Sequence, residues 1–147
     1  MDYFWKILQH KYFVFQAGLQ FRVSIWRLII HDWTKFLPIE YLGYQRQFFG
    51  KVKNKDQWQR TWLHHQNHNP HHWEYWIQRP SGKSLAMPEW AIREMVADWF
   101  GASKAYAGFY PTSLSKWDWF QKNKERIQLH EDTWHRVNEL LESQLEA

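Results

Sequence analysis

Apolar residues recur at intervals of three and four along most of this chain, and that spacing limits the fold more than any other feature. Residues 3–16 place Phe4, Ile7, Leu8 and Phe15 at such intervals, which predicts a helix with one wide apolar face. No stretch alternates apolar and polar residues for long enough to indicate a strand, and no internal repeat is visible. The sequence therefore predicts an all-α protein.

Glycine and proline divide the chain into further helices and one long loop. We expect Gly18 to interrupt the first helix and Gly50 to end a later one. The segment 68–88, with three prolines, is expected to be mainly loop with one helical turn near residues 71–76. The other expected helices span residues 21–33, 37–50, 56–67, 89–108, 113–127 and 131–146.

Length and composition indicate one compact domain over residues 1–147. The chain has 147 residues, of which 44% are hydrophobic, enough to bury a substantial core. It contains no cysteine, which excludes disulfides, thiolate zinc sites and cysteine nucleophiles. Any metal must therefore be held by imidazole nitrogens and carboxylate oxygens.

The charge and the N-terminal sequence bear on partners and location. The net charge is +4 from 19 basic and 15 acidic residues, which suits anionic ligands but is too weak to identify a nucleic-acid-binding protein. The N-terminus lacks the basic region of a signal peptide, and no apolar run approaches the roughly 18 residues of a membrane span. We expect a cytoplasmic protein with no membrane partner.

The stretch "IIHDWTKF", residues 29–36, raises the question of a metal site. His31 and Asp32 follow an apolar run, so they are either metal ligands or only the polar end of a buried helix. Other suitable ligands, His10, His64, His65 and Asp98, lie on separate expected helices. Imidazole and carboxylate together suit zinc, manganese, iron, cobalt or nickel, and do not discriminate among them.

The order His10, His31-Asp32, Asp98 resembles the H…HD…D signature of the HD-domain superfamily of metal-dependent phosphohydrolases, which are all-helical. HDWTK is similar to the HDxGK form of that signature, with Thr34 in place of glycine. LHHQNHNPHH is similar to the HHE segment of HD-GYP phosphodiesterases, but Gln66 replaces glutamate and no GYP is present. Activity on cyclic dinucleotides is therefore not implied.

A likeness that covers nearly the whole chain is to a group of short uncharacterised phage and bacterial proteins. They share patterns similar to HDWTKF, LHHQ…HHWEYW, EMVADWFGA and NKERIQLH. This likeness supports the alignment of the HD residues and implies no particular substrate.

The HD resemblance implies one or two divalent metal ions and a role for each candidate residue. Asp32 would bridge to a second ion, and a metal-bound water would attack phosphorus. Lys35, one helical turn beyond Asp32, would pair with a phosphate oxygen. Glu94, four residues before Asp98, would orient a ligand histidine or accept a proton from the water. The first ion would be held by His10, His31, Asp32 and Asp98, and the second by His64, His65 or a histidine of the His71-His72 pair.

We therefore expect an HD-like phosphohydrolase acting on a phosphorylated small molecule, in particular a nucleotide or a nucleotide derivative. Trp33, Trp73 and Trp76 flank the candidate ligands and are either base-stacking or core residues, with core packing favoured. The alternative is a non-catalytic helical module that holds a metal or binds nucleic acid or a protein partner. A catalytic ion keeps an open coordination position and a structural one does not, and the sequence leaves that choice open.

Overall fold

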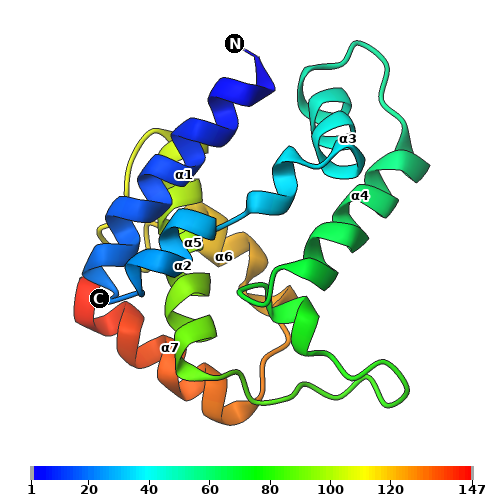
Figure 1. Ribbon diagram of the computed structural model, residues 1–147. Helices are drawn as coiled ribbons and strands as arrows, with labels where there is room; N and C mark the ends of the chain where they lie inside the picture. Colours follow the sequence, from blue (N-terminus) through cyan, green and yellow to red (C-terminus); the bar gives the residue numbers. More distant parts are fainter. Residues whose placement is uncertain (1, 147) are drawn as a thin grey trace.

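A computed structural model describes residues 2–146, and within that range the secondary structure is helical. The predicted all-α class is confirmed: the only β-type pairings among the described residues are two isolated bridges, Ile77 with Ser84 and Ser113 with Glu146. Figure 1 shows the arrangement. The elements are α1 (Tyr3–Gln20), α2 (Ile25–Ile30), η1 (Trp33–Phe36), α3 (Pro38–Phe49), α4 (Lys55–His68), η2 (Trp73–Trp76), α5 (Glu89–Ala107), α6 (Asp118–Asn123), η3 (Lys124–Arg126) and α7 (Glu131–Gln144), where η denotes a 3-10 helix.

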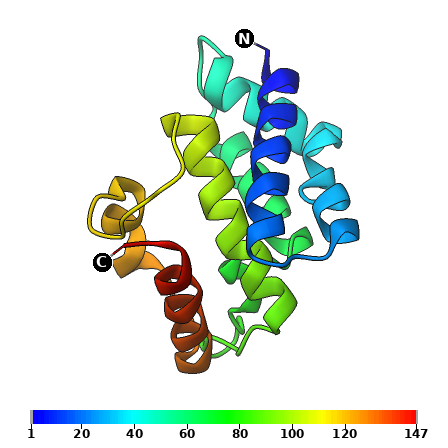
Figure 2. The same ribbon diagram turned by 90° about the vertical axis from the view of Figure 1, so that its left-hand side faces the viewer.

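Helix α5 is the centre of the molecule. It runs beside α1 along much of its length, and α7 packs near its other side (Figure 2). Met95, Val96 and Phe100 of α5 are almost completely buried and belong to the main apolar cluster, which extends to Val137 of α7. A smaller buried cluster, formed by Tyr3, Ile7 and Tyr44, joins α1 to α3. The most heavily buried helix thus carries the sequence segment that includes Asp98.

A glycine allows α1 and α5 to approach closely. A Cβ atom at Gly101 would lie 2.5 Å from the backbone nitrogen of Val14, so no larger residue fits without separating the helices. Gly101 follows Asp98 by three residues and Val14 follows His10 by four, which places each pair on one helix face. The close crossing therefore brings His10 to Asp98.

A second glycine does the same for α3 and α4. A Cβ atom at Gly43 would lie 1.8 Å from Oγ1 of Thr61. Glu40 precedes Gly43 by three residues, and His65 follows Thr61 by four. This crossing brings the Glu40 carboxylate next to His64 and His65 of α4.

Three expected boundaries were wrong. Helix α1 continues through Gly18 to Gln20. Glycine at this position makes room for Leu28 of α2, which packs where a side chain would be, and it does not end the helix. The expected helix 21–33 is only Ile25–Ile30, since Arg22 adopts a left-handed conformation with φ of 57° that starts a turn. The expected helix 113–127 is a loop followed by α6 and η3.

The expected loop between α4 and α5 is confirmed, with η2 as its helical turn. None of the helices found between residues 2 and 146 has the length and apolarity needed to cross a membrane.

Candidate metal centre

A sharp turn after α2 directs His31 and Asp32 into the protein. Asp32 has φ 55° and ψ 25°, the left-handed region that aspartate tolerates better than most residues. The Lys11 ammonium of α1 donates to the carbonyl oxygens of Ile29, at 3.1 Å, and of His31, which holds the end of α2 against α1. As a result both side chains are buried, with residue exposures of 2% for His31 and 1% for Asp32.

The first ligand group consists of one nitrogen or oxygen atom from each of four buried residues, His10, His31, Asp32 and Asp98. His10 Nε2 lies 3.1 Å from Asp32 Oδ2 and 3.1 Å from Asp98 Oδ1. His31 Nε2 lies 3.5 Å and 3.3 Å from the same two oxygens. Ligand atoms about 2.0–2.2 Å from one transition metal ion are separated by about 3.0–3.5 Å when adjacent. The four atoms therefore have the spacing of a coordination shell.

The second ligand group consists of Asp32, His65, His71 and His72. Asp32 Oδ1, the other oxygen of the same carboxylate, lies 3.4 Å from His65 Nε2 and 3.2 Å from His71 Nε2. The Nε2 atoms of His65 and His72 are 2.9 Å apart. Asp32 thus faces one ligand group with each oxygen, as a carboxylate that bridges two ions does.

Several of these buried atoms have no hydrogen-bond partner within the described part of the chain. They are His31 Nε2, Asp32 Oδ1, His71 Nε2 and Asp98 Oδ1. Their mutual distances are short, but the geometry is not that of hydrogen bonds. A buried polar atom left unpaired costs about 1–3 kcal/mol, so four of them facing one another indicate a ligand of positive charge. The centre can hold a metal ion.

Two buried carboxylates lie behind the ligand histidines. Glu94 Oε1 is 2.9 Å from His31 Nδ1 and 3.3 Å from His71 Nδ1, and Glu40 Oε2 is 2.8 Å from His65 Nδ1. A carboxylate that accepts from Nδ1 fixes the tautomer with Nε2 free to bind a metal. The ligand nitrogens are thereby presented in the orientation that coordination needs.

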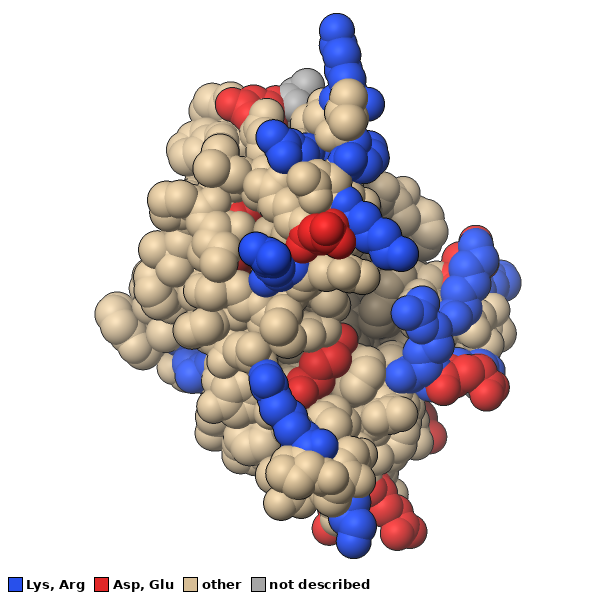
Figure 3. Space-filling model, turned by 90° about the vertical axis from the view of Figure 1, so that its right-hand side faces the viewer, with Lys and Arg blue, Asp and Glu red and all other residues tan. Residues whose placement is uncertain are grey.

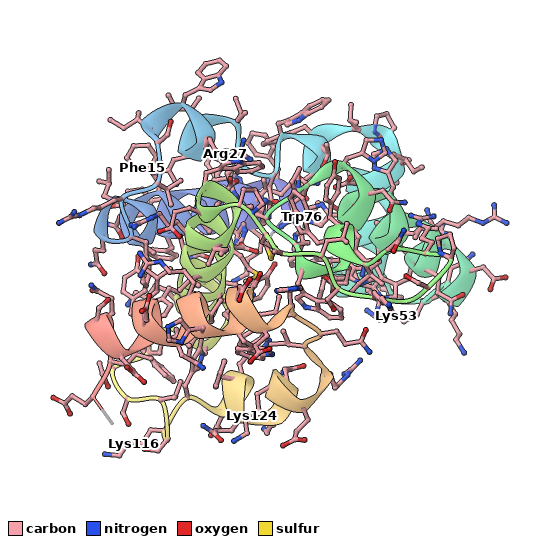
Figure 4. The ribbon with its side chains drawn as sticks, turned by 90° about the horizontal axis from the view of Figure 1, so that it is seen from below. Phe15, Arg27, Lys53, Trp76, Lys116 and Lys124 are labelled. Atoms are coloured by element: carbon pink, nitrogen blue, oxygen red, sulfur yellow. The ribbon has the colours of Figure 1, made fainter. Side chains whose placement is uncertain are left out.

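Arg27 closes the outer side of Glu94. Its guanidinium pairs with Glu94 Oε2 and lies 3.9 Å from the ring centroid of Trp90, and Figure 4 shows Arg27 between α2 and α5. His31, His71 and Glu94 by themselves also form a group with ligand spacing. Because a cation already sits against that carboxylate, we assign Glu94 to orienting the two histidines and not to a third ion.

Hydrogen bonds hold the irregular segment that carries His71 and His72. The Asn69 amide donates to Thr34 Oγ1 of η1 and to the His65 carbonyl oxygen, both at 2.8 Å. The Trp76 indole donates to the Pro70 carbonyl oxygen at 2.7 Å. The segment is therefore tied to η1, to α4 and to η2, next to Asp32.

The electrostatics of the centre are those of buried opposite charges. Burial raises the pKa of Asp32, but His31, Lys35 and His65 outweigh it and hold that pKa well below the usual range. Burial lowers the pKa of His71, yet the carboxylates of Asp32 and Glu94 raise it to about 10. In the absence of metal, protons on histidines thus compensate the carboxylate charge.

The structure brings together most of the residues singled out from the sequence. His10, His31, Asp32, His65 and Asp98 all contribute to the two ligand groups. Lys35 is buried with its Nζ 2.6 Å from Asp32 Oδ2, beside the centre and one turn beyond Asp32 as expected. Glu94 lies behind His31, with its Oε1 2.9 Å from His31 Nδ1, the position that the orienting role requires.

His64 is not part of either ligand group. It precedes His65 on α4 and points about 100° away from it, so its Nδ1 meets Glu40 Oε1 at 2.6 Å and its ring stacks on His68. His68 Nδ1 in turn bonds to the His64 carbonyl oxygen at 2.8 Å. Glu40 gave no signal in the sequence, and its burial on α3 is seen only in the structure.

The comparisons with known proteins give a family and no activity. The family model that matches, over residues 1–143, is described as Family of unknown function (DUF5662). A search of curated proteins and a search of solved structures found no match to the chain.

Proposed function

We propose that this chain, which belongs to the family of unknown function DUF5662, is an HD-type metal-dependent phosphohydrolase. The observation that carries the proposal is the position of Asp32, which lies between two groups of ligand atoms and faces each with a different oxygen. Two ions that share a carboxylate form a common arrangement for phosphoester hydrolysis, because both sides of the phosphorus can be stabilised.

The ligand set fits divalent transition metals. Five imidazoles and two carboxylates contribute to the two groups, a mixture suited to manganese, iron, cobalt, nickel or zinc. Bound there, such ions would lower the pKa of a water molecule and neutralise charge on phosphoryl oxygens. The protein's own contribution is to fix the ligand nitrogens through Glu40 and Glu94 and to exclude bulk water.

Lys35 and Asp98 are the residues positioned to meet a substrate. Asp98 is the most exposed of the first group, with 12% of its side-chain surface accessible, and we take its side as the approach for a substrate. The Lys35 ammonium, held at Asp32 and 5.4 Å from the Tyr44 ring centroid, adds a fixed positive charge for a phosphate oxygen. Burial lowers the pKa of Lys35, but Asp32 outweighs it and the pKa is raised, so this charge persists at neutral pH.

Aromatic side chains beside the centre support a nucleotide or nucleotide-derived substrate. The Tyr106 ring lies 6.5 Å from the His10 ring and 6.2 Å from the Phe48 ring, and Tyr106 and Phe48 are each about half exposed. Lys6 Nζ is 4.8 Å from the Tyr106 ring centroid. Half-exposed rings next to a cation suit a planar base attached to phosphate.

The proposal is tested by metal analysis followed by turnover. We expect the purified protein, loaded in turn with manganese, iron, cobalt, nickel and zinc, to bind two ions and to release phosphate or a nucleotide from at least one member of a phosphoester panel. His31→Ala and His71→Ala should each keep one ion and lose activity, and His135→Ala, on the exposed face of α7, should keep both ions and full activity.

Two results would contradict the proposal. If the reconstituted wild type bound no metal, these residues would not form a metal centre. Two bound ions with no turnover of mono-, di- or triesters of phosphate would leave the non-catalytic metal-holding module as the function.

A further inference from the structure

The outer side of α1, α2 and η1 is a continuous apolar face that nothing in the described chain covers. Three of its indoles, Trp5, Trp26 and Trp33, are 62%, 65% and 53% exposed, although tryptophan is usually mostly buried. Figure 2 shows α2 and η1 along the edge of the molecule, beside α1. We call this the tryptophan face, formed by Trp5, Leu8, Tyr12, Trp26, Ile29 and Trp33.

Two contacts hold α1 beside η1 and α2 on this side of the molecule. The Phe4 ring of α1 lies 6.4 Å from the Phe36 ring of η1. Lys11 of α1, which neighbours Tyr12, donates to the carbonyl oxygen of Ile29 at 3.1 Å. With bordering residues such as Phe4 and Phe36, the exposed apolar area is on the order of 700–1,000 Å², above the roughly 300–600 Å² of the largest patch on a typical monomer.

Within residues 3–55 this part of the chain exposes no carboxylate, although Asp2 at the start of α1 is exposed. Between residues 3 and 55 the acidic residues are Asp32 and Glu40, and both are buried. Basic side chains remain at the surface: Arg22 lies at the turn that leads into α2, whereas Lys51 and Lys53 lie farther away, in the loop between α3 and α4 (Figure 1). Figure 3 shows lysine and arginine gathered at the upper end of the molecule and a left-hand part with few charged side chains.

We propose that the tryptophan face docks on the surface of an anionic phospholipid membrane. Tryptophan favours the boundary between headgroups and acyl chains, aliphatic neighbours such as Leu8 and Ile29 add apolar area there, and Arg22 together with the net charge of +4 attracts anionic headgroups. Docking needs no spanning helix. The sequence-based expectation of no membrane partner rested on the lack of a spanning segment alone, and it could not show which apolar residues are exposed.

Charge and chemistry favour this occupant over two others. A second copy placed face to face would bring Arg22 against a like-charged chain, with no exposed carboxylate between residues 3 and 55 to pair with it. Nucleic acid is bound mainly through phosphate contacts, which isoleucine and leucine side chains do not make. An anionic lipid surface matches both the apolar and the cationic part.

The face and the metal centre share one segment of chain. Ile29, Trp33 and Phe36 point outward, while His31, Asp32 and Lys35 between them are buried. A membrane bound to this face would therefore cover the outer wall of the turn that presents Asp32. The proposal is nevertheless independent of the hydrolase function, because it rests on the exposed side chains alone.

The experiment is flotation with lipid vesicles of phosphatidylcholine alone or with one third phosphatidylglycerol. We expect the wild type to float with the anionic vesicles, less at high salt, and not with the neutral ones. Trp26→Ser/Ile29→Ser should weaken the partitioning about tenfold or more, from the lost apolar burial. Leu63→Ser, which removes a half-exposed leucine of α4, is the matched control and should float as the wild type does.

Metal content and circular dichroism, measured on every variant, show that the fold is retained, and Trp5→Ser tests the face from a different helix. Failure of the wild type to float with anionic vesicles would overturn the proposal. Equal flotation of the wild type and both face variants would show that the tryptophan face does not make the membrane contact. A dimer in light scattering that Trp26→Ser/Ile29→Ser dissociates, without flotation, would assign the face to a second copy.

Discussion

The two ligand groups that share Asp32 are held by different kinds of structure. In the first group, His10 and Asp98 stand on two long helices that cross at Gly101. In the second, His65 stands on α4, but His71 and His72 lie in an irregular segment tied down by Asn69. Two ligands of the first group stand on regular helices and two on the turn after α2, whereas in the second group only His65 stands on a regular helix.

This difference indicates which half is the more robust. Helix packing is spread over many apolar contacts, so it resists single substitutions that leave volume unchanged. A short segment held by single hydrogen bonds loses a larger share of its support when one bond is removed. We expect the first ion to be bound more tightly and the second to respond more sharply to changes in the segment 69–72.

The largest effect is expected where the two groups meet. Asp32→Ala removes a ligand from both groups, so metal content should fall from two equivalents to none, as measured by plasma mass spectrometry. Asp56→Ala, on the exposed first turn of α4, should keep two. Retention of either ion by Asp32→Ala would show that the groups do not share this carboxylate.

Gly101→Ala should damage the first group through the helix crossing. Its Cβ would meet the Val14 backbone, so the free energy of unfolding should fall by about 1–3 kcal/mol, with weaker binding of the first ion. Denaturant unfolding and metal titration measure both effects. Ala102→Gly is the control, because it lowers the helix propensity of α5 by about 1 kcal/mol without adding an atom at the crossing. Normal metal binding by Gly101→Ala would show that the site does not depend on the close crossing of α1 and α5.

Asn69→Ala should affect the second group alone. It removes the hydrogen bonds to Thr34 and to the His65 carbonyl oxygen, and loss of such supporting partners lowers metal affinity by about 10–100-fold. Calorimetric titration should show one tight and one weakened site. Asn67→Ala, which loses only an exposed contact with Arg79, is the control, and equal weakening of both sites would contradict the separation.

A smaller effect is expected from pH on the metal-free protein. The folded pKa of His71 is raised to about 10 from an ordinary value of 6.5, so its protonation stabilises the fold fully below about pH 6.5, and this stability is lost as pH rises toward 10. Chelator-treated protein should therefore be easier to unfold with urea at about pH 9.5 than at about pH 6.5. His71→Ala should flatten this dependence, and metal-loaded protein should not show it, because metal takes the place of the protons.

The smallest effect is expected for His64→Ala. Its side chain meets Glu40 and stacks on His68, outside both ligand groups, so two ions should remain. His65→Ala, one residue along the helix, should lose the second ion. Loss of metal from His64→Ala with retention by His65→Ala would reverse the assignment on α4.

The contrast between the two groups also explains what could be predicted from the sequence. The resemblance to the HD order led to His10, His31, Asp32 and Asp98, and the helical period placed His10 and Asp98 on separate helices. His71 and His72 could be named only as alternatives to His64, since no periodicity orders an irregular segment. The left-handed turn at Asp32 and the buried Glu40 depend on tertiary contacts with Lys11 and α4, which local sequence does not encode.

The measurement that bears most directly on the centre is anomalous X-ray diffraction from crystals grown with manganese or zinc. We expect two anomalous peaks about 3.5–4 Å apart, one beside each oxygen of Asp32, the first among His10, His31 and Asp98 and the second among His65, His71 and His72. No peak at Asp32 under saturating metal, or a single ion bound away from it, would contradict the shared centre.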